Sequence, residues 1–272
     1  MSKTVGVAGR RPPKPQAARP RHGRTIVALM LREMGSRYGR TPGGYLWAVL
    51  EPLGMIVMLA IGFGLLLRNP PLGGSFIMFY ATGHLVYTLF LRTNTCVMNA
   101  LTYSRNLLAY PAVTWIDAVL ARFILNVLTD LLVAAVLLFA IMQLVDHRSS
   151  LAFGEILAAF GLAALLGAGA GLMNCILMGF FPVWKNVWSI VTRPLFLASG
   201  VIWIYEELPS LAQDVLWWNP LVHITGLARD GFYGTYAPQH ISFNLMIIPG
   251  LIMTALGLLL LRRYHLWVIN AR

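Results

Sequence analysis

The stretch RYGRTPGGYLWAVLEP, residues 37–52, marks where this chain passes from a basic segment to an apolar one. The break TPGG at 41–44 supplies a helix-stopping proline and two glycines with permissive backbone angles. Tyr45 and Trp47 follow it and fit the aromatic belt of a membrane–water interface. We therefore expect a helix in the membrane plane before the break and a membrane span after it.

Glu51 is unusual in this stretch, because a carboxylate about one turn inside a span is costly. One interpretation places Glu51 at the depth of the lipid headgroups, where it pairs with Arg37 or Arg40. The other places it near the cytoplasmic mouth of a hydrated path. The sequence leaves both open.

The composition assigns the chain to the membrane proteins. Hydrophobic residues make up 58% of the 272 residues, charged residues make up 11%, and the mean hydropathy is +0.69. A soluble domain has about 25% charged residues, so this chain cannot cover a water-facing surface. The fold class we predict is an all-α polytopic membrane protein.

The net charge of +11 is concentrated at the N-terminus. Residues 1–44 hold ten lysines and arginines and one acidic residue, Glu33. Such a segment is typical of the cytoplasmic side of a membrane and of contact with anionic lipid. We expect no nucleic-acid partner, because no folded basic module accompanies the charge, and we expect residues 1–23, which are rich in proline and arginine, to be a disordered tail.

Apolar periodicity predicts an interfacial amphipathic helix at 24–39 and six spans long enough for a hydrocarbon core of about 30 Å. The spans are expected near 45–67, 76–100, 113–144, 153–181, 187–204 and 242–261. Loop charges place both termini in the cytoplasm by the positive-inside rule. Between the fifth and sixth spans, residues 205–241 predict two short re-entrant or interfacial helices broken at Asn219-Pro220.

Several kinds of chemistry have no matching motif. The sequence contains no phosphate-binding loop of the G-x-x-x-x-G-K-[ST] type, and its six histidines form no i,i+3 or i,i+4 pair. Cys96 and Cys175 both lie inside apolar stretches and indicate neither a metal site nor a disulfide framework. We therefore expect no catalytic site, no metal and no cofactor bound by this chain.

Polar residues inside the predicted spans are grouped. Arg92 and Asn94 interrupt the second span, and Arg122, Asn126 and Asp130 recur every four residues on one face of the third. An antiparallel pair of spans would let these side chains meet, and isolated charges there would need a partner or water. A buried structural network and a hydrated substrate path both fit, and we expect at least Arg92 to face the path.

The fourth span has a face of small residues. Ala159, Ala163, Gly167 and Gly171 follow each other at four-residue spacing, with Gly169 beside them. Such a face permits close approach of two helix backbones. Whether it meets another span of the same chain or a second copy stays open at this stage.

Three stretches resemble the membrane subunits of type-2 ATP-binding-cassette exporters, and within these the capsular polysaccharide export permeases. They are LREMGSRYGRTPGGYLWAVLEP at 31–52, NLLAYPAVTWIDAVLAR at 106–122 and WWNPLVHITGLARDGFYG at 217–234. The resemblance covers roughly 24–265, and the order of the stretches is more specific than any one of them. It identifies 24–272 as a type-2 exporter transmembrane domain.

The resemblance implies a homodimer in a bacterial inner membrane, with two separate ATPase subunits that bind ATP and Mg²⁺. It implies export of a lipid-linked polysaccharide, a capsular one being favoured, alongside periplasmic co-polymerase and outer-membrane export proteins. ATPase coupling would then fall to the 104–111 loop and the 24–39 helix, although an ordinary tight turn is the alternative for the loop. The residues expected to act in coupling are Arg105, Asn106, Leu107, Leu108, Tyr110, Arg32 and Arg37.

Residues near the last span are expected to form an outer gate or to contact the glycan. These are Tyr205, Trp217, Trp218, Arg229, Tyr233 and Tyr236. Aromatic rings with polar tips suit a sugar surface, but they also suit an interfacial anchor. The sequence favours the gate or anchor over direct glycan contact.

Other functions remain as alternatives. The same fold would serve an exporter of O-antigen, teichoic acid or a small drug. A membrane-embedded transferase acting on lipid-linked sugars would need an acidic metal-binding pair or a catalytic histidine and aspartate close together, and neither spacing is present. A passive scaffold would leave Arg92 and Asp130 without a reason.

Overall fold

The computed structural model describes residues 22–38, 44–110, 112–145 and 151–270, and this part of the chain is built from helices without strands. The all-α prediction is therefore confirmed for the described residues. The elements are α1 His22–Tyr38, α2 Gly44–Leu66, α3 Phe76–Met98, α4 Ala100–Tyr103, α5 Arg105–Leu108, α6 Trp115–Leu144, α7 Phe153–Phe180, α8 Trp184–Leu197, the short 3-10 helix Tyr205–Glu207, α9 Ser210–Leu216, α10 Pro220–Phe232 and α11 Phe243–Asn270.

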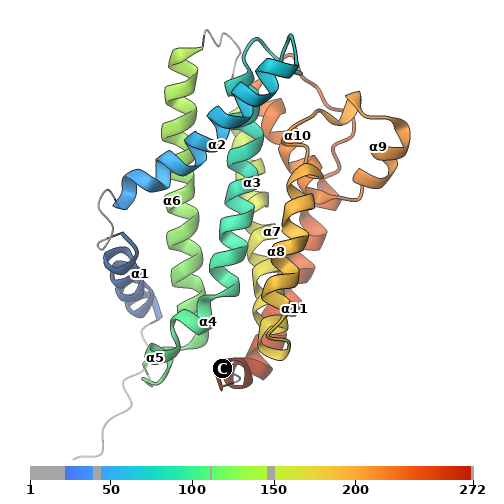
Figure 1. The fold of residues 1–272 in the computed structure, drawn as a ribbon. Coiled ribbons are helices and arrows are strands. Elements are labelled where there is room, and N and C mark those ends of the chain that lie inside the picture. Colours follow the sequence, from blue (N-terminus) through green and yellow to red (C-terminus); the bar gives the residue numbers. More distant parts are fainter. Residues whose placement is uncertain (1–21, 39–43, 111, 146–150, 271–272) are drawn as a thin grey trace, which may run out of the picture.

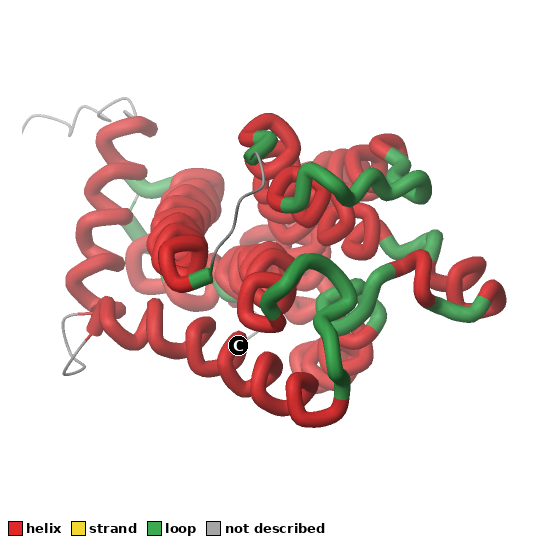
Figure 2. Tube along the Cα trace, turned by 90° about the horizontal axis from the view of Figure 1, so that it is seen from above, coloured by secondary structure: helices red, strands yellow, loops and turns green. Residues whose placement is uncertain are grey.

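The long helices α3, α6, α7 and α11 run side by side, and α2 crosses them obliquely (Figures 1 and 2). One end of this bundle holds α4, α5 and the C-terminal end of α11, while the opposite end holds α9 and the connection between α2 and α3 (Figure 1). The helix α1 lies across the bundle axis and packs against α6 (Figures 1 and 2). The predicted 1–23 tail, apart from His22 and Gly23 in α1, and residues 41–43 of the predicted break lie outside the described residues.

Helix α7 is at the centre, packed against α3, α10 and α11. Its small residues make this possible. A Cβ on Gly167 would come 2.7 Å from the Phe90 carbonyl oxygen of α3, and one on Gly169 would come 2.8 Å from the Gly250 carbonyl oxygen of α11. The small-residue face therefore meets helices of the same chain, which decides between the two alternatives left open by the sequence.

Two helix starts follow directly from the sequence. Thr114 and Asp117 form a capping box at the start of α6, in which the Asp117 backbone N–H donates to the threonine hydroxyl and the Asp117 carboxylate accepts the Thr114 N–H at 3.1 Å. At α10, the Asn219 side chain accepts the Leu221 N–H at 3.1 Å, and Pro220 occupies the first turn. The predicted break at Asn219-Pro220 is present, with α9 on one side and α10 on the other.

Within the described part of the chain, four helices are long and apolar enough to cross a membrane, namely 46–66, 115–144, 153–180 and 243–270. Helix α3 has 23 residues, but Arg92 and other polar side chains lower its hydropathy. Helix α8 has 14 residues and ends at Leu197, earlier than the expected 204, because residues 198–203 leave helical geometry and give carbonyl oxygens to side chains of α10 and its Asn219 cap. In contrast, α11 continues to Asn270, beyond the expected 261.

Candidate functional site

A charged cluster connects α2, α3 and α6. The Arg92 guanidinium donates to Asp130 Oδ1 at 3.0 Å and to Glu51 Oε2 at 2.8 Å. The Asn126 amide donates to the second oxygen of Asp130 at 2.9 Å and lies 3.4 Å from the Thr93 hydroxyl. Asn126 and Asp130, four residues apart on α6, thus lie on the face that meets α3, where Asp130 binds Arg92. The sequence predicted this contact from an antiparallel pair of spans.

The two carboxylates of this cluster have different environments. The Asp130 side chain is 7% exposed, whereas the Glu51 side chain is 76% exposed. In the described structure Glu51 pairs with Arg92, while Arg40 and the side chain of Arg37 lie outside the described residues. An exposed carboxylate is compatible with water at headgroup depth and with water in a path, so both interpretations of Glu51 stay predictions.

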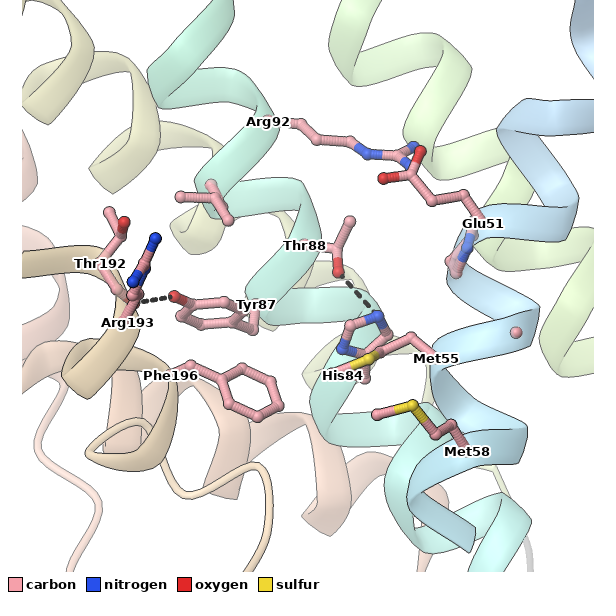
Figure 3. A pocket seen from close by; sticks show the side chains of 13 residues that line it. Glu51, Met55, Met58, His84, Tyr87, Thr88, Arg92, Thr192, Arg193 and Phe196 are labelled. Carbon is pink, nitrogen blue, oxygen red and sulfur yellow. Dashed lines mark hydrogen bonds and ion pairs between the residues drawn. The ribbon is translucent and has the colours of Figure 1, made fainter. Parts of the chain in front are cut away.

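A groove of about 510 Å³ opens between α2, α3 and α8 beside this cluster (Figure 3). Its lining combines charged, aromatic and thioether side chains, including Glu51, Met55, His84, Tyr87, Arg92 and Arg193. The Tyr87 hydroxyl donates to the Thr192 carbonyl oxygen at 3.0 Å and fixes α8 against α3. Arg92 therefore lies where a substrate path would require it, and its contact with a substrate stays a prediction.

Arg193 is a groove residue that was not among the predicted site residues. It is exposed on α8 and lines the groove. The signal was present, because a single arginine inside a predicted span costs about 2.5–3.5 kcal/mol on insertion scales unless it faces water or a partner. Such a residue is therefore a functional candidate by position alone.

Asn94, expected in the same path, lies elsewhere. Its side-chain oxygen accepts the Asn174 amide at 2.9 Å, and the Asn174 oxygen accepts the Trp184 indole N–H at 2.8 Å. Asn94 is fully buried between α3 and α7. Residues two apart on a helix do not share a face, so Arg92 and Asn94 point to different neighbours and the prediction that groups them is corrected.

A second charged contact joins α1 to the bundle. The Arg122 Nε donates to Glu33 Oε1 at 2.9 Å, and its Nη1 donates to the Asn99 carbonyl oxygen at 3.1 Å. The guanidinium of Arg122 lies 4.4 Å from the Tyr103 ring centre. Arg122 was expected beside Asn126, yet it faces the end of the bundle that holds α4 and α5. The acidic Glu33 in an otherwise basic segment was the available signal for this pair.

The residues expected to act in ATPase coupling gather at that end. Helix α5 begins at Arg105, and Asn106 and Tyr110 are exposed, Tyr110 by 64%. Leu107 and the exposed Arg32 line a pocket of about 190 Å³ between α1 and α6. Leu108 instead packs against the apolar core formed with α6, α7 and α11. The side chain of Arg37 lies outside the described residues.

Arg229, which was expected among the outer-gate or glycan-contact residues, is buried, and its role in a gate stays a prediction. It is 2% exposed and donates to the carbonyl oxygens of Trp203 at 3.0 Å and Val201 at 2.8 Å. Its guanidinium lies 4.0 Å from the ring centre of Phe79. Because these carbonyls lack helical partners, a long buried cation with several donors satisfies them.

The remaining gate candidates are Tyr233 with the tryptophan pair Trp217–Trp218, and the two tyrosines Tyr205 and Tyr236 of a polar cluster. Tyr233 is buried and Trp218 is 70% exposed, with Trp217 packed edge-on against it at 5.2 Å. Tyr205 and Tyr236 belong to a polar cluster around a residue that the sequence analysis had not singled out, Glu206.

In that cluster, the Glu206 carboxylate accepts the Tyr236 hydroxyl at 2.9 Å and contacts His240 Nδ1 at 2.9 Å, and the Tyr205 ring stacks on His240. Burial raises the pKa of the Tyr205 and Tyr236 phenols, and the Glu206 carboxylate raises both further. Both phenols therefore stay protonated and can donate. This cluster ties the 205–207 turn to the 236–240 loop.

Comparison with known proteins shows which family the chain matches and which proteins it resembles. Residues 24–233 match the family described as ABC-2 type transporter. The chain is 28% identical over 238 residues to the polysialic acid transport protein KpsM of Escherichia coli, covering 88% of this chain and 92% of that protein. It is 26% identical over 244 residues to the capsule polysaccharide export inner-membrane protein BexB of Haemophilus influenzae, covering 89% and 91%.

A third relative is the capsule polysaccharide export inner-membrane protein CtrC of Neisseria meningitidis serogroup A, 25% identical over 243 residues, with 89% and 91% of the two chains covered. The family match extends from α1 to the end of α10 and includes the groove and the α5 end of the bundle. The chain therefore belongs to the membrane-spanning family of ABC-2 type transporters.

Proposed function

We propose that this chain is the permease subunit of an ATP-driven exporter that moves a polysaccharide, most favourably a capsular one carried on a lipid, across the bacterial inner membrane. The observation that carries the proposal is the match of the chain, over nearly its whole length, to polysaccharide export permeases. The groove beside the Glu51–Arg92–Asp130 cluster supports it, because an exposed charged lining suits a hydrated path better than a lipid-facing surface.

The arrangement in the membrane is part of the proposal. The six spans would be α2, α3, α6, α7, α11 and α8 with the segment that follows it, and the end with α4 and α5 would face the cytoplasm. Two copies would place their α2 and α8 surfaces around one path, since α8 has no buried residue and α2 has few in the single chain. Two ATPase subunits would supply ATP and Mg²⁺ chemistry, and periplasmic and outer-membrane export proteins would continue the route.

Deleting the gene for this chain in its host tests the function. We expect surface polysaccharide to disappear and the glycan to accumulate inside the cell, with both effects reversed by a plasmid copy. The measurement is chemical analysis of surface and intracellular glycan. Loss of O-antigen or teichoic acid alone would select that alternative substrate. Unchanged surface glycan together with new drug sensitivity would contradict the proposal.

The coupling role of the α5 end gives a second expected result. The double substitution Asn106→Ala/Tyr110→Ala should lower copurification of the ATPase subunit about tenfold or more, because an aromatic hot spot at the centre of an interface contributes about 2 kcal/mol or more. Both side chains are exposed, so folding should be unaffected. Phe153→Ala, which removes a 74% exposed aromatic at the opposite end of the bundle, is the matched control. Full ATPase recovery with the double variant would refute the role.

A further inference from the structure

Arg193 is a groove cation without a carboxylate partner among the described residues. It lines the groove from α8, and it is exposed there. Among the residues that the structure describes, no carboxylate lies within ion-pair distance of it. It sits nine residues after Trp184, the first residue of α8, or roughly 13 Å along the helix axis at 1.5 Å per residue. A guanidinium at that depth favours a negatively charged partner.

Arg92, the other groove arginine, is already neutralised. Asp130 and Glu51 both accept hydrogen bonds from its guanidinium, at 3.0 and 2.8 Å. An anion that approached Arg92 would have to displace a carboxylate and would meet the charge of the other one. Recognition of an anion at this groove therefore falls to Arg193, on the wall opposite Glu51 and Arg92 (Figure 3).

The wall that holds Arg193 is fixed in place. The hydrogen bond from Tyr87 to the carbonyl of Thr192, the residue before Arg193, ties this turn of α8 to α3. One turn further, the Phe196 ring packs edge-on against Tyr87, with ring centres 5.2 Å apart, and against His84 at 6.2 Å. A positioned cation thus lies beside aromatic side chains, which is a suitable surface for an acidic sugar.

We propose that Arg193 binds an acidic group of the exported polysaccharide, a carboxylate or a phosphodiester, and so makes this groove selective for anionic glycans. This inference rests on the proposed export function and adds the residue that recognises the acidic group of the glycan. The chosen source of the anion is the glycan. A lipid phosphate is less suitable for two reasons. Arg193 lies away from both ends of α8, and it shares its groove with the exposed Glu51 carboxylate, which requires water.

The test uses the full-length protein in phosphatidylcholine nanodiscs. Binding is measured for a short sialic acid oligomer and for the same oligomer with its carboxyl groups reduced to alcohols. We expect the wild type to bind the acidic oligomer at least about tenfold more tightly than the reduced oligomer. A charge-assisted hydrogen bond contributes binding free energy of that size. Arg193→Gln should remove the difference, and Arg193→Lys should keep part of it. Lys185→Gln makes the same change of charge on α8 outside the groove lining and should keep all of it.

The same variants are then compared in the deletion strain. Arg193→Gln should lower surface polysaccharide about tenfold at equal protein level, with Lys185→Gln unchanged. Retained discrimination in Arg193→Gln, or wild-type protein that binds both oligomers equally or neither, overturns the inference while the export function stands on the deletion result. Arg193-dependent binding of phosphatidylglycerol in place of the acidic oligomer would assign the site to lipid and also overturn it. Surface glycan that survives the deletion removes the export function itself.

Discussion

Gly171→Leu is expected to destabilise the protein by about 3 kcal/mol, the upper end of the typical range for overpacked cores. Helices α7 and α3 touch at this point through their backbones. A Cβ on Gly171 would come 2.8 Å from both the Asn94 carbonyl oxygen and the Val97 Cβ. A backbone carbonyl cannot rotate away as a side chain can, so the two helices would have to separate along their contact. Thermal unfolding in detergent, followed by tryptophan fluorescence, measures the loss.

The control for this prediction is on the same helix. Gly161 has nothing within 4 Å of its Cβ position and is exposed. Gly161→Leu should therefore leave the unfolding temperature nearly unchanged. Equal behaviour of the two variants would show that the close α3–α7 contact is wrong. A large loss confined to Gly171→Leu would confirm that small residues set the distance between these helices.

Asp130→Ala is the second substitution with a large expected effect. The Asp130 carboxylate is buried and accepts from both Arg92 and Asn126. Breaking a buried ion pair by removal of one partner costs about 3–5 kcal/mol, because the remaining charge loses its compensation. Arg92 keeps Glu51 as a partner, so we expect a loss of about 3 kcal/mol, measured by the same unfolding assay.

Glu51→Gln is the matched comparison. It removes the other carboxylate bound to Arg92, but that side chain is 76% exposed. An exposed pair contributes about 0–1 kcal/mol, so stability should hardly change. If Glu51→Gln were as destabilising as Asp130→Ala, Glu51 would be part of a buried network and the groove beside it would not be hydrated. If Asp130→Ala were neutral, the cluster would have no structural role.

Local pattern predicted much of this molecule. The low charge content and the apolar runs determined an all-helical membrane protein, and Asn219-Pro220 determined the break between α9 and α10. Helical spacing also brought Asn126 and Asp130 onto one face, which the structure pairs with Arg92. These features depend on the helical repeat of 3.6 residues and on capping chemistry. Both are set by residues that are close together in the sequence.

Other parts of the site depend on how the helices are turned and tilted against one another. Sequence spacing could not tell that Glu51 of the oblique α2 reaches Arg92, since that contact joins residues 41 positions apart. Nor could sequence spacing tell that Arg229 is buried, where its guanidinium donates to the carbonyl oxygens of residues 201 and 203.

The sequence by itself thus determined the class of protein, the all-helical build of the described residues and the shared polar face of Asn126 and Asp130. Only the tertiary structure decided which of the two groove arginines has carboxylate partners among the described residues. Arg92 and Arg193 are both single arginines in predicted apolar spans, so the sequence does not distinguish them. In the structure Arg92 lies between two carboxylates, whereas Arg193 lines the open groove. The physical reason is that a charge is satisfied by its neighbours in space, and the rotation of α2, α3, α6 and α8 about their own axes selects those neighbours.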